Sequence, residues 1–260
     1  MKIFTCLKEV PDRDTRYQLQ TEGTGIIETD LTFEISECDE YSLEESLKLR
    51  EEHGGEVIIL TVGRERAERS IRKGLAMGAD RAILVEDAEG RASNPHAVAL
   101  VLAEVLKQQQ CDLILAGTQS DDLSYAQTGV ILAELLDLPH ATIVMKIEAD
   151  ESNRKVKAMR EMESGWFEWV EMPMPAVLTI QAGISQVRYA SLKGIMQAKK
   201  KEIRKINVND LNLDLESVPQ LEILKLYFPE STRRAEILEG DTPTVVRELV
   251  ERLKKEARVL

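Results

Sequence analysis

Several features that identify common protein classes are scarce or missing in this sequence. Aromatic residues make up 4% of the 260 residues, which leaves few rings to stack on single-stranded nucleic acid. The formal net charge is −12, which argues against nucleic-acid binding as the main function and favours basic partners. Neither the G-x-x-x-x-G-K-[ST] phosphate loop nor the G-x-G-x-x-G dinucleotide motif is present.

Cysteines and long apolar runs are also scarce. The three cysteines, Cys6, Cys38 and Cys111, form no C-x-x-C pair, and an odd number argues against a disulfide framework. The N-terminal MKIFTCLKEV has no apolar stretch of signal-peptide length, and no run approaches the roughly 20 apolar residues that a bilayer requires. We therefore expect a reducing compartment and a cytoplasmic protein without membrane insertion.

The histidines and thiols offer little chemistry. His53, His96 and His140 are scattered, with no spacing suited to a metal site or to a nucleophile and its base. Cys38 lies beside Glu37 and Asp39, and neighbouring carboxylates raise a thiol pKa and oppose reactivity. We therefore expect no metal site.

Strands and helices alternate through the first half of the chain. Apolar and β-branched runs predict strands over residues 2–10, 56–62, 81–86 and 112–116. Helical spacing predicts a helix after residues 36–39, capped by Ser36 or Asp39, and further helices over 66–77 and 96–109. This alternation predicts an α/β fold with a Rossmann-like, mostly parallel sheet, whose ligands bind outside the carboxyl ends of the strands.

The second half has a different pattern. A helix is predicted over 130–136, antiparallel strands over 142–147, 156–161 and 166–171, and another strand over 175–180. Trp166 and Trp169 are expected to pack. The remaining predictions are a hairpin at 21–30, an irregular stretch at 205–234 and an amphipathic helix over 242–257. The basic residues 199–201 form either a solvated helix face or a contact for an acidic partner.

The loop GTQSDDLSYAQTG, residues 117–129, is the most informative segment. It combines hydroxyls and amides with the start of a helix, where unpaired backbone N–H groups suit a phosphate. Asp121 and Asp122 could accept hydrogen bonds from a ribose or cap the helix. An ordinary capped loop between a strand and a helix explains the same residues, and the loop alone leaves both interpretations open. Residues 36–39 and Val62-Gly63 would reach the same crevice in a doubly wound sheet, or are generic turns.

Residues 188–199 have the sequence RYASLKGIMQAK. This segment resembles the motif R-Y-x-[ST]-L-x-x-I-M-x-A-K-K, which the beta subunit of electron transfer flavoprotein carries at this position. The strand before it, PAVLT at 175–179, resembles the family's P-A-V-[LV]-T. Similar segments are LKEVPD at 7–12, DEYSLEE at 39–45, LAMGAD at 75–80 and the loop at 117–129. The tail, with ILEG at 237–240, is most similar to the longer beta subunits that serve amine dehydrogenases in methylotrophs.

The resemblance implies an adenine nucleotide alpha-hydrolase-like fold and a heterodimer with an alpha subunit that holds most of the redox-active FAD. The beta subunit would hold AMP in a structural role and would pass electrons from a flavin-containing dehydrogenase to an acceptor. It would be an electron carrier without substrate turnover and without catalytic side chains. Residues 1–182 would form the nucleotide-binding domain, and residues 183–260 the recognition loop and an arm that wraps the partner.

The resemblance also assigns residues. The AMP contacts map onto Cys6, Ser36, Glu37, Cys38, Asp39, Val62, Gly117, Thr118, Gln119, Ser120, Asp121, Asp122, Leu123, Ser124, Tyr125, Ala126, Gln127 and Thr128. The partner-docking residues map onto Ile184, Arg188, Tyr189, Leu192, Lys193, Ile195 and Met196, with Leu192 as the anchor.

The chain departs from the family pattern at two places. Ser36-Glu37-Cys38 stands where relatives often have N-P-[FY], so an aromatic that can approach the flavin is absent at Cys38. Electron-bifurcating relatives hold a second FAD in place of AMP and tend to show D-G-D-T-A-Q-V-G in the loop. Asp122 and Thr128 at the positions of that Gly and Val favour AMP. Two alternatives to AMP binding in an electron-carrier subunit stay open. The chain could be a bifurcating-type subunit with a second FAD in place of AMP, or a free-standing ATP-binding module built on the same sheet.

Overall fold

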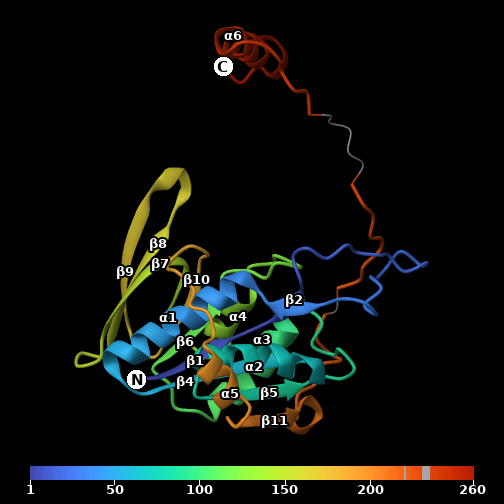
Figure 1. Cartoon of the computed structure of the whole chain (residues 1–260). Helices are drawn as coiled ribbons and strands as arrows, with labels where there is room; N and C mark the ends of the chain where they lie inside the picture. The colour runs from blue at the N-terminus through green and yellow to red at the C-terminus, as the bar shows by residue number, and fades with distance from the viewer. Residues whose placement is uncertain (220, 230–234) are drawn as a thin grey trace. The chain divides into compact units, whose positions relative to one another are not determined.

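The computed structural model describes residues 1–219, 221–229 and 235–260. Within these residues, nine strands form one sheet in the order β11-β5-β4-β1-β6-β10-β7-β8-β9 (Figure 1). The strands are β1 (Lys2–Cys6), β4 (Glu56–Gly63), β5 (Arg81–Glu86), β6 (Leu113–Gly117), β7 (His140–Asp150), β8 (Lys155–Glu161), β9 (Phe167–Pro173), β10 (Ala176–Ile180) and β11 (Ile203–Asn207). Neighbours from β11 to β7 pair in parallel, and β7, β8 and β9 pair antiparallel. The predicted mostly parallel α/β sheet is confirmed.

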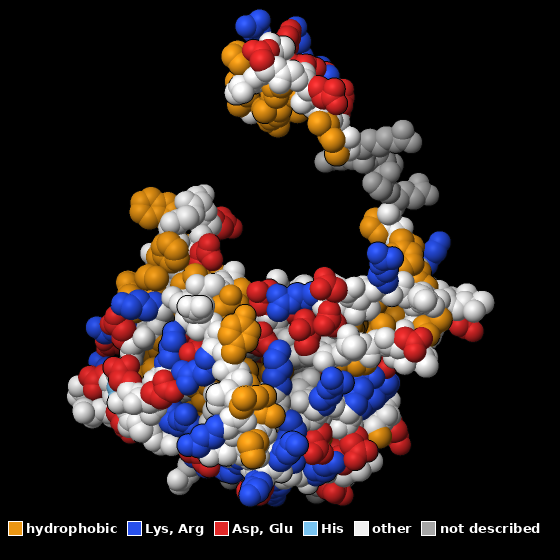
Figure 2. All heavy atoms as spheres, viewed as in Figure 1, with side chains coloured by type: hydrophobic (Ala, Val, Ile, Leu, Met, Phe, Trp, Pro, Cys, Tyr) orange, Lys and Arg blue, Asp and Glu red, His pale blue; other side chains and the backbone are white. Residues whose placement is uncertain are grey.

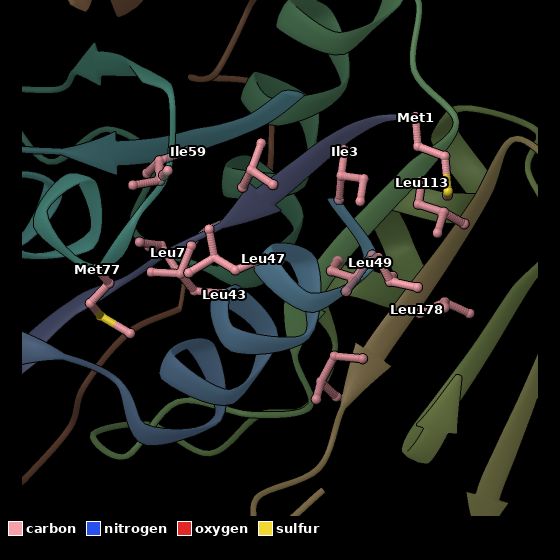
Figure 3. Close-up of a cluster of buried hydrophobic side chains, with 14 of the residues drawn as sticks. Met1, Ile3, Leu7, Leu43, Leu47, Leu49, Ile59, Met77, Leu113 and Leu178 are labelled. Carbon is pink, nitrogen blue, oxygen red and sulfur yellow. The ribbon is translucent and has the colours of Figure 1, made fainter. Parts of the chain in front are cut away.

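Helices cover both faces of the parallel part of the sheet. They are α1 (Glu37–His53), α2 (Glu68–Met77), α3 (Pro95–Lys107), α4 (Thr128–Leu135) and α5 (Leu192–Ala198). Successive side chains of a strand point to opposite faces, so Ile3 of β1 packs with α1, α2 and α5, whereas Phe4 packs with α3 and α4. Figure 3 shows the first of these two cores, where Leu43 and Leu47 of α1 lie beside Leu7.

The predicted single strand over residues 2–10 is wrong. The chain leaves the sheet after Cys6, and β2 (Glu9–Pro11) pairs antiparallel with β3 (Phe33–Ile35) outside the main sheet. The break occurs at Leu7 and Lys8, where the backbone N–H of Lys8 donates to the carboxylate of Asp39 at 2.8 Å. A side chain remote in sequence therefore ends the strand, which no local pattern indicates.

Two other predictions in the second half are corrected. β11 and a 3₁₀ turn at Val208–Leu211 occupy the beginning of the stretch predicted to be irregular, residues 205–234, of which 220 and 230–234 lie outside the described residues. Trp166 is 74% exposed and Trp169 is 46% exposed, so the expected packing of both rings is wrong. Hydrophobic side chains are visible at the tip of the β8–β9 hairpin (Figure 2).

The chain divides into two compact units. The first comprises residues 1–18 and 27–222, with the sheet and the helices α1 to α5. The second comprises residues 19–26 and 223–260. It contains a short antiparallel bridge between Leu19 and Ile26, at the place of the expected hairpin, and the predicted amphipathic helix, α6 (Thr242–Arg252). The functional boundary after Ala182 stays a prediction. Across the described residues, no helix is long and apolar enough to cross a membrane.

Candidate functional site

The carboxyl ends of three adjacent strands open into one pocket. β4, β1 and β6 are neighbours in the sheet, and they end at Gly63, Cys6 and Gly117. The pocket has a volume of about 310 Å³, which lies within the usual range for small-molecule sites. The predicted site residues that line it are Cys6, Asp39, Val62, Gly117, Thr118, Gln119, Ser120, Asp122, Leu123, Tyr125, Ala126, Gln127 and Thr128.

Asp39 holds two of these strand ends together. It is buried within α1, and its carboxylate accepts hydrogen bonds from the backbone N–H of Lys8 at 2.8 Å and of Gly117 at 2.7 Å. Burial raises the pKa of Asp39 to about 7, although both N–H donors act against that rise. A Cβ atom at Gly117 would lie 2.6 Å from Asp39 Oδ1, so only glycine permits this contact. Of the two predicted caps, Asp39 lies inside α1, and Ser36 occupies the N-cap position without a capping hydrogen bond from its side chain.

Ser36, Glu37 and Asp121 do not line the pocket but attach its loop to α1. Ser36 is the residue before α1, and its Oγ accepts from the backbone N–H of Asp121 at 3.2 Å. In return, the backbone N–H of Glu37 donates to Asp121 Oδ2 at 2.8 Å. The predicted interaction between these segments is thus reciprocal, and Asp121 satisfies a donor of α1 instead of one in α4. Cys38 and Ser124 also lie outside the lining.

Lys8 supplies the positive charge of the pocket. Its Nζ lies 2.7 Å from Asp122 Oδ1 and 3.2 Å from Ser120 Oγ. Burial would raise the pKa of Asp122, but the Lys8 ammonium more than offsets it, and the net shift is downward. Of the described residues that line this pocket, Lys8 alone has a basic side chain. Lys8 belongs to the LKEVPD segment but was not among the predicted site residues. Its position just beyond the carboxyl end of a parallel strand is the signal that could have indicated it.

The N-terminus of α4 lies beside the charged side of the pocket. The first N–H groups of a helix lack partners within the helix and carry partial positive charge. Gly129 allows the close packing of α4, because a Cβ there would lie 2.5 Å from Thr179 Cγ2. Ser124 and Ala126 in the preceding loop have φ values of 50° and 54°, a strained conformation for residues with side chains that gathers at ligand sites.

The opposite wall of the pocket is apolar. It includes Leu60, Val62, Val98 and Leu102. Residues 92–95, at the start of α3, also line the pocket, and the sequence did not indicate them. Thr118 also lines the pocket, and its Oγ1 is buried without a hydrogen-bond partner in the described part of the chain. A buried hydroxyl without a partner is costly. The pocket therefore combines apolar side chains with a lysine and the start of a helix, which fits a ligand with an apolar ring and an anionic group.

The thiols at the pocket are poor nucleophiles. Burial raises the pKa of Cys6 to about 12, and the nearby Asp39 acts in the same direction. Burial also raises the pKa of Cys38. Because the thiolate is the reactive form, both groups are inert at neutral pH, and the arrangement is suited to binding.

A second group of predicted residues lies on α5 and the segment before it. Tyr189 is 97% exposed, Leu192 83% and Met196 71%, and Lys193 and Ile195 are also exposed. Figure 2 shows hydrophobic side chains over α5 with Lys and Arg side chains around them. Two other predicted docking residues face inward, since Ile184 packs against the core and Arg188 pairs with Glu44 of α1.

Comparisons with known proteins agree with these features. The chain matches the family model for the electron transfer flavoprotein domain over residues 24–211. It is 37% identical over 246 residues to the electron transfer flavoprotein subunit beta of Methylophilus methylotrophus, covering 92% of this chain and 93% of that relative. It is 35% identical to the subunit beta of Bacillus subtilis over the full length of both, and 32% identical to the human subunit beta, with 100% of this chain and 99% of the relative covered.

Proposed function

The chain belongs to the beta-subunit family of electron transfer flavoproteins, and we propose that it holds AMP in the pocket at the ends of β4, β1 and β6. Beta subunits of this family pair with an alpha subunit. In this proposal FAD, held mainly by the alpha subunit, supplies the redox chemistry. The chain described here positions that flavin domain and turns over no substrate of its own.

The chemistry of the pocket walls supports AMP. The apolar side chains of Leu60, Val98 and Leu102 offer a surface for adenine. The Nζ of Lys8 and the N-terminus of α4 provide positive charge for a phosphate. The joint presence of apolar side chains, a lysine and the start of α4 in one pocket at the strand ends is the observation that carries the proposal.

The exposed surface of α5 supports the second part of the function, docking of an electron donor. We define the docking surface as Tyr189, Leu192, Ile195 and Met196. Contiguous exposed apolar side chains mark interaction sites in soluble proteins. Lys193, Lys199 and Lys200 beside them favour a flavin dehydrogenase with an acidic rim around an apolar pocket.

The nucleotide content of the purified complex tests the proposal. The chain is produced with its alpha subunit, the complex is denatured, and the released nucleotides are separated and quantified. One AMP and one FAD per heterodimer is the expected result. Two FAD and no AMP would assign the chain to the electron-bifurcating class, and a stable monomer that hydrolyses ATP would establish a free-standing nucleotide-binding module instead.

A further inference from the structure

Arg188 attaches the docking surface to helix α1. Its Nε lies 2.8 Å from Glu44 Oε2, its Nη2 lies 3.0 Å from Glu44 Oε1, and its backbone N–H donates to Glu44 Oε2 at 3.1 Å. The same guanidinium also reaches Glu51, seven residues further along α1, with Nη2 at 3.1 Å from Oε2. One side chain therefore joins two carboxylates of α1 to the residue directly before Tyr189.

The Glu44 carboxylate depends on this contact. Its side chain is 4% exposed, whereas that of Glu51 is 51% exposed. An ionised carboxylate withdrawn from water is tolerated only when it is paired and hydrogen-bonded. Arg188 provides a planar fork that satisfies both oxygens of Glu44, a geometry that lysine cannot reproduce.

Two further contacts seat α5 on α2. Gly194 packs directly against the C-terminal turn of α2, where a Cβ atom would collide with the carbonyl oxygen of Ala76. Arg72 of α2 donates from Nη1 to the carbonyl oxygens of Ala198 at 2.7 Å and Lys201 at 2.8 Å, at the end of α5. These contacts fix the helix at its middle and its end, and the residues before it are held by Arg188 together with the packing of Val187 and Ala190 against the core.

We propose that Arg188 is a positioning residue that holds Tyr189 and Leu192 outward for docking, and that it does not itself contact the electron donor. The inference rests on the docking function proposed above. Apolar side chains as exposed as these gain by collapsing onto the protein surface unless the backbone that carries them is held. The salt bridges to Glu44 and Glu51 of α1 provide that restraint. Because they engage the guanidinium, it is not available to the electron donor.

A direct contact between Arg188 and the donor is the competing explanation, and Glu44 separates the two. If Arg188 bound the donor directly, Glu44→Gln would free the guanidinium and leave docking unchanged or tighter. If Arg188 acts by positioning, Glu44→Gln weakens docking as Arg188→Ala does. The double variant is then no weaker than either single variant, since both remove one restraint.

The test uses the full heterodimer and a purified flavin-containing amine dehydrogenase as the probe. Reduction of the flavin is followed at increasing dehydrogenase concentration for Arg188→Ala, Arg188→Lys, Glu44→Gln and the double variant. We expect the half-saturating concentration to rise at least about tenfold and the limiting rate and flavin content to stay as in the unmodified complex. Hydrogen exchange of residues 188–196 should be faster in the same variants.

Two control variants make the result specific. Arg81→Ala removes a similar two-pronged pair with Glu56, in which Nε and Nη2 lie 2.7 and 3.2 Å from the carboxylate, away from the docking surface. It should leave docking unchanged. Leu192→Ala should weaken docking without faster hydrogen exchange. If Leu192→Ala weakens docking and Arg188→Ala does not, the positioning role is refuted; if neither does, the docking function itself fails.

Discussion

Replacement of Asp39 by asparagine should destabilise the protein by an amount that depends on pH. Asparagine has one acceptor oxygen, so it can serve only one of the two backbone N–H groups, of Lys8 and Gly117, that the carboxylate serves now. A buried donor left without a partner costs about 1–3 kcal/mol. The same substitution also removes a titratable group, so the loss in the free energy of unfolding changes with pH.

The sign of the pH effect follows from the raised pKa. Asp39 titrates at about 7 in the folded chain, compared with the ordinary value of 3.8. Its contribution to stability is therefore complete below about pH 4 and is lost as the pH rises to about 7, because ionising a buried carboxyl is costly. At roughly 1.4 kcal/mol per pKa unit, Asp39→Asn should be more destabilising at pH 5.5 than at pH 7.5 by about 2 kcal/mol.

Urea unfolding of the nucleotide-depleted complex at both pH values measures this difference. Asp112→Asn is the matched control, because Asp112 also accepts a backbone N–H, that of Lys2 at 2.7 Å, but has a lowered pKa. The contribution of Asp112 to stability is lost only as the pH falls below the ordinary carboxyl pKa. The effect of Asp112→Asn on the free energy of unfolding should therefore be the same at pH 5.5 and pH 7.5. An equal or smaller effect of Asp39→Asn at pH 5.5 would show that Asp39 is ionised throughout, and the reasoning from burial would be wrong.

Three other predictions concern the pocket and the docking surface. Gly117→Ala should abolish nucleotide retention, because the new Cβ would lie 2.6 Å from Asp39 Oδ1. The control Gly63→Ala, at the end of β4, makes an ordinary contact of 3.6 Å with Ala67 and should retain the nucleotide. Nucleotide analysis after gel filtration distinguishes the two variants. Lys8→Gln should weaken AMP binding about tenfold or more and leave adenosine binding nearly unchanged, by calorimetry on depleted complex; equal losses would mean that Lys8 does not sense the phosphate. Leu192→Ala should slow reduction by the dehydrogenase at unchanged flavin content, and a matching loss of flavin would mean that Leu192 is structural.

The parallel part of the sheet was predictable because its strands are buried on both faces. β4 and β6 appear in the sequence as continuous apolar runs, and the helices between strands have apolar positions at helical spacing. β11 escaped prediction because it is an edge strand, Ile203–Asn207, with only two apolar residues, so it has no such run. Its partner β5 precedes it by more than one hundred residues, so only the folded chain defines the pair.

The pocket was predictable to a similar degree. The loop 117–129 and the residues before α1 were identified because loops after parallel strands gather at one edge of a sheet. Lys8 was not assigned, because a lysine after a short strand has no distinctive pattern. Its role depends on Asp122, more than one hundred residues away.

By itself, the sequence determined the fold class, the family and the segments that carry the site, since burial and turn chemistry are written in local spacing. The tertiary structure decided what each charged residue does. Asp39, one of two predicted helix caps, joins two strand ends. Arg188, predicted from the sequence as a docking residue, pairs with a buried carboxylate. The physical reason is that the energy of a charge depends on its burial and on its partners, and both are properties of the folded chain.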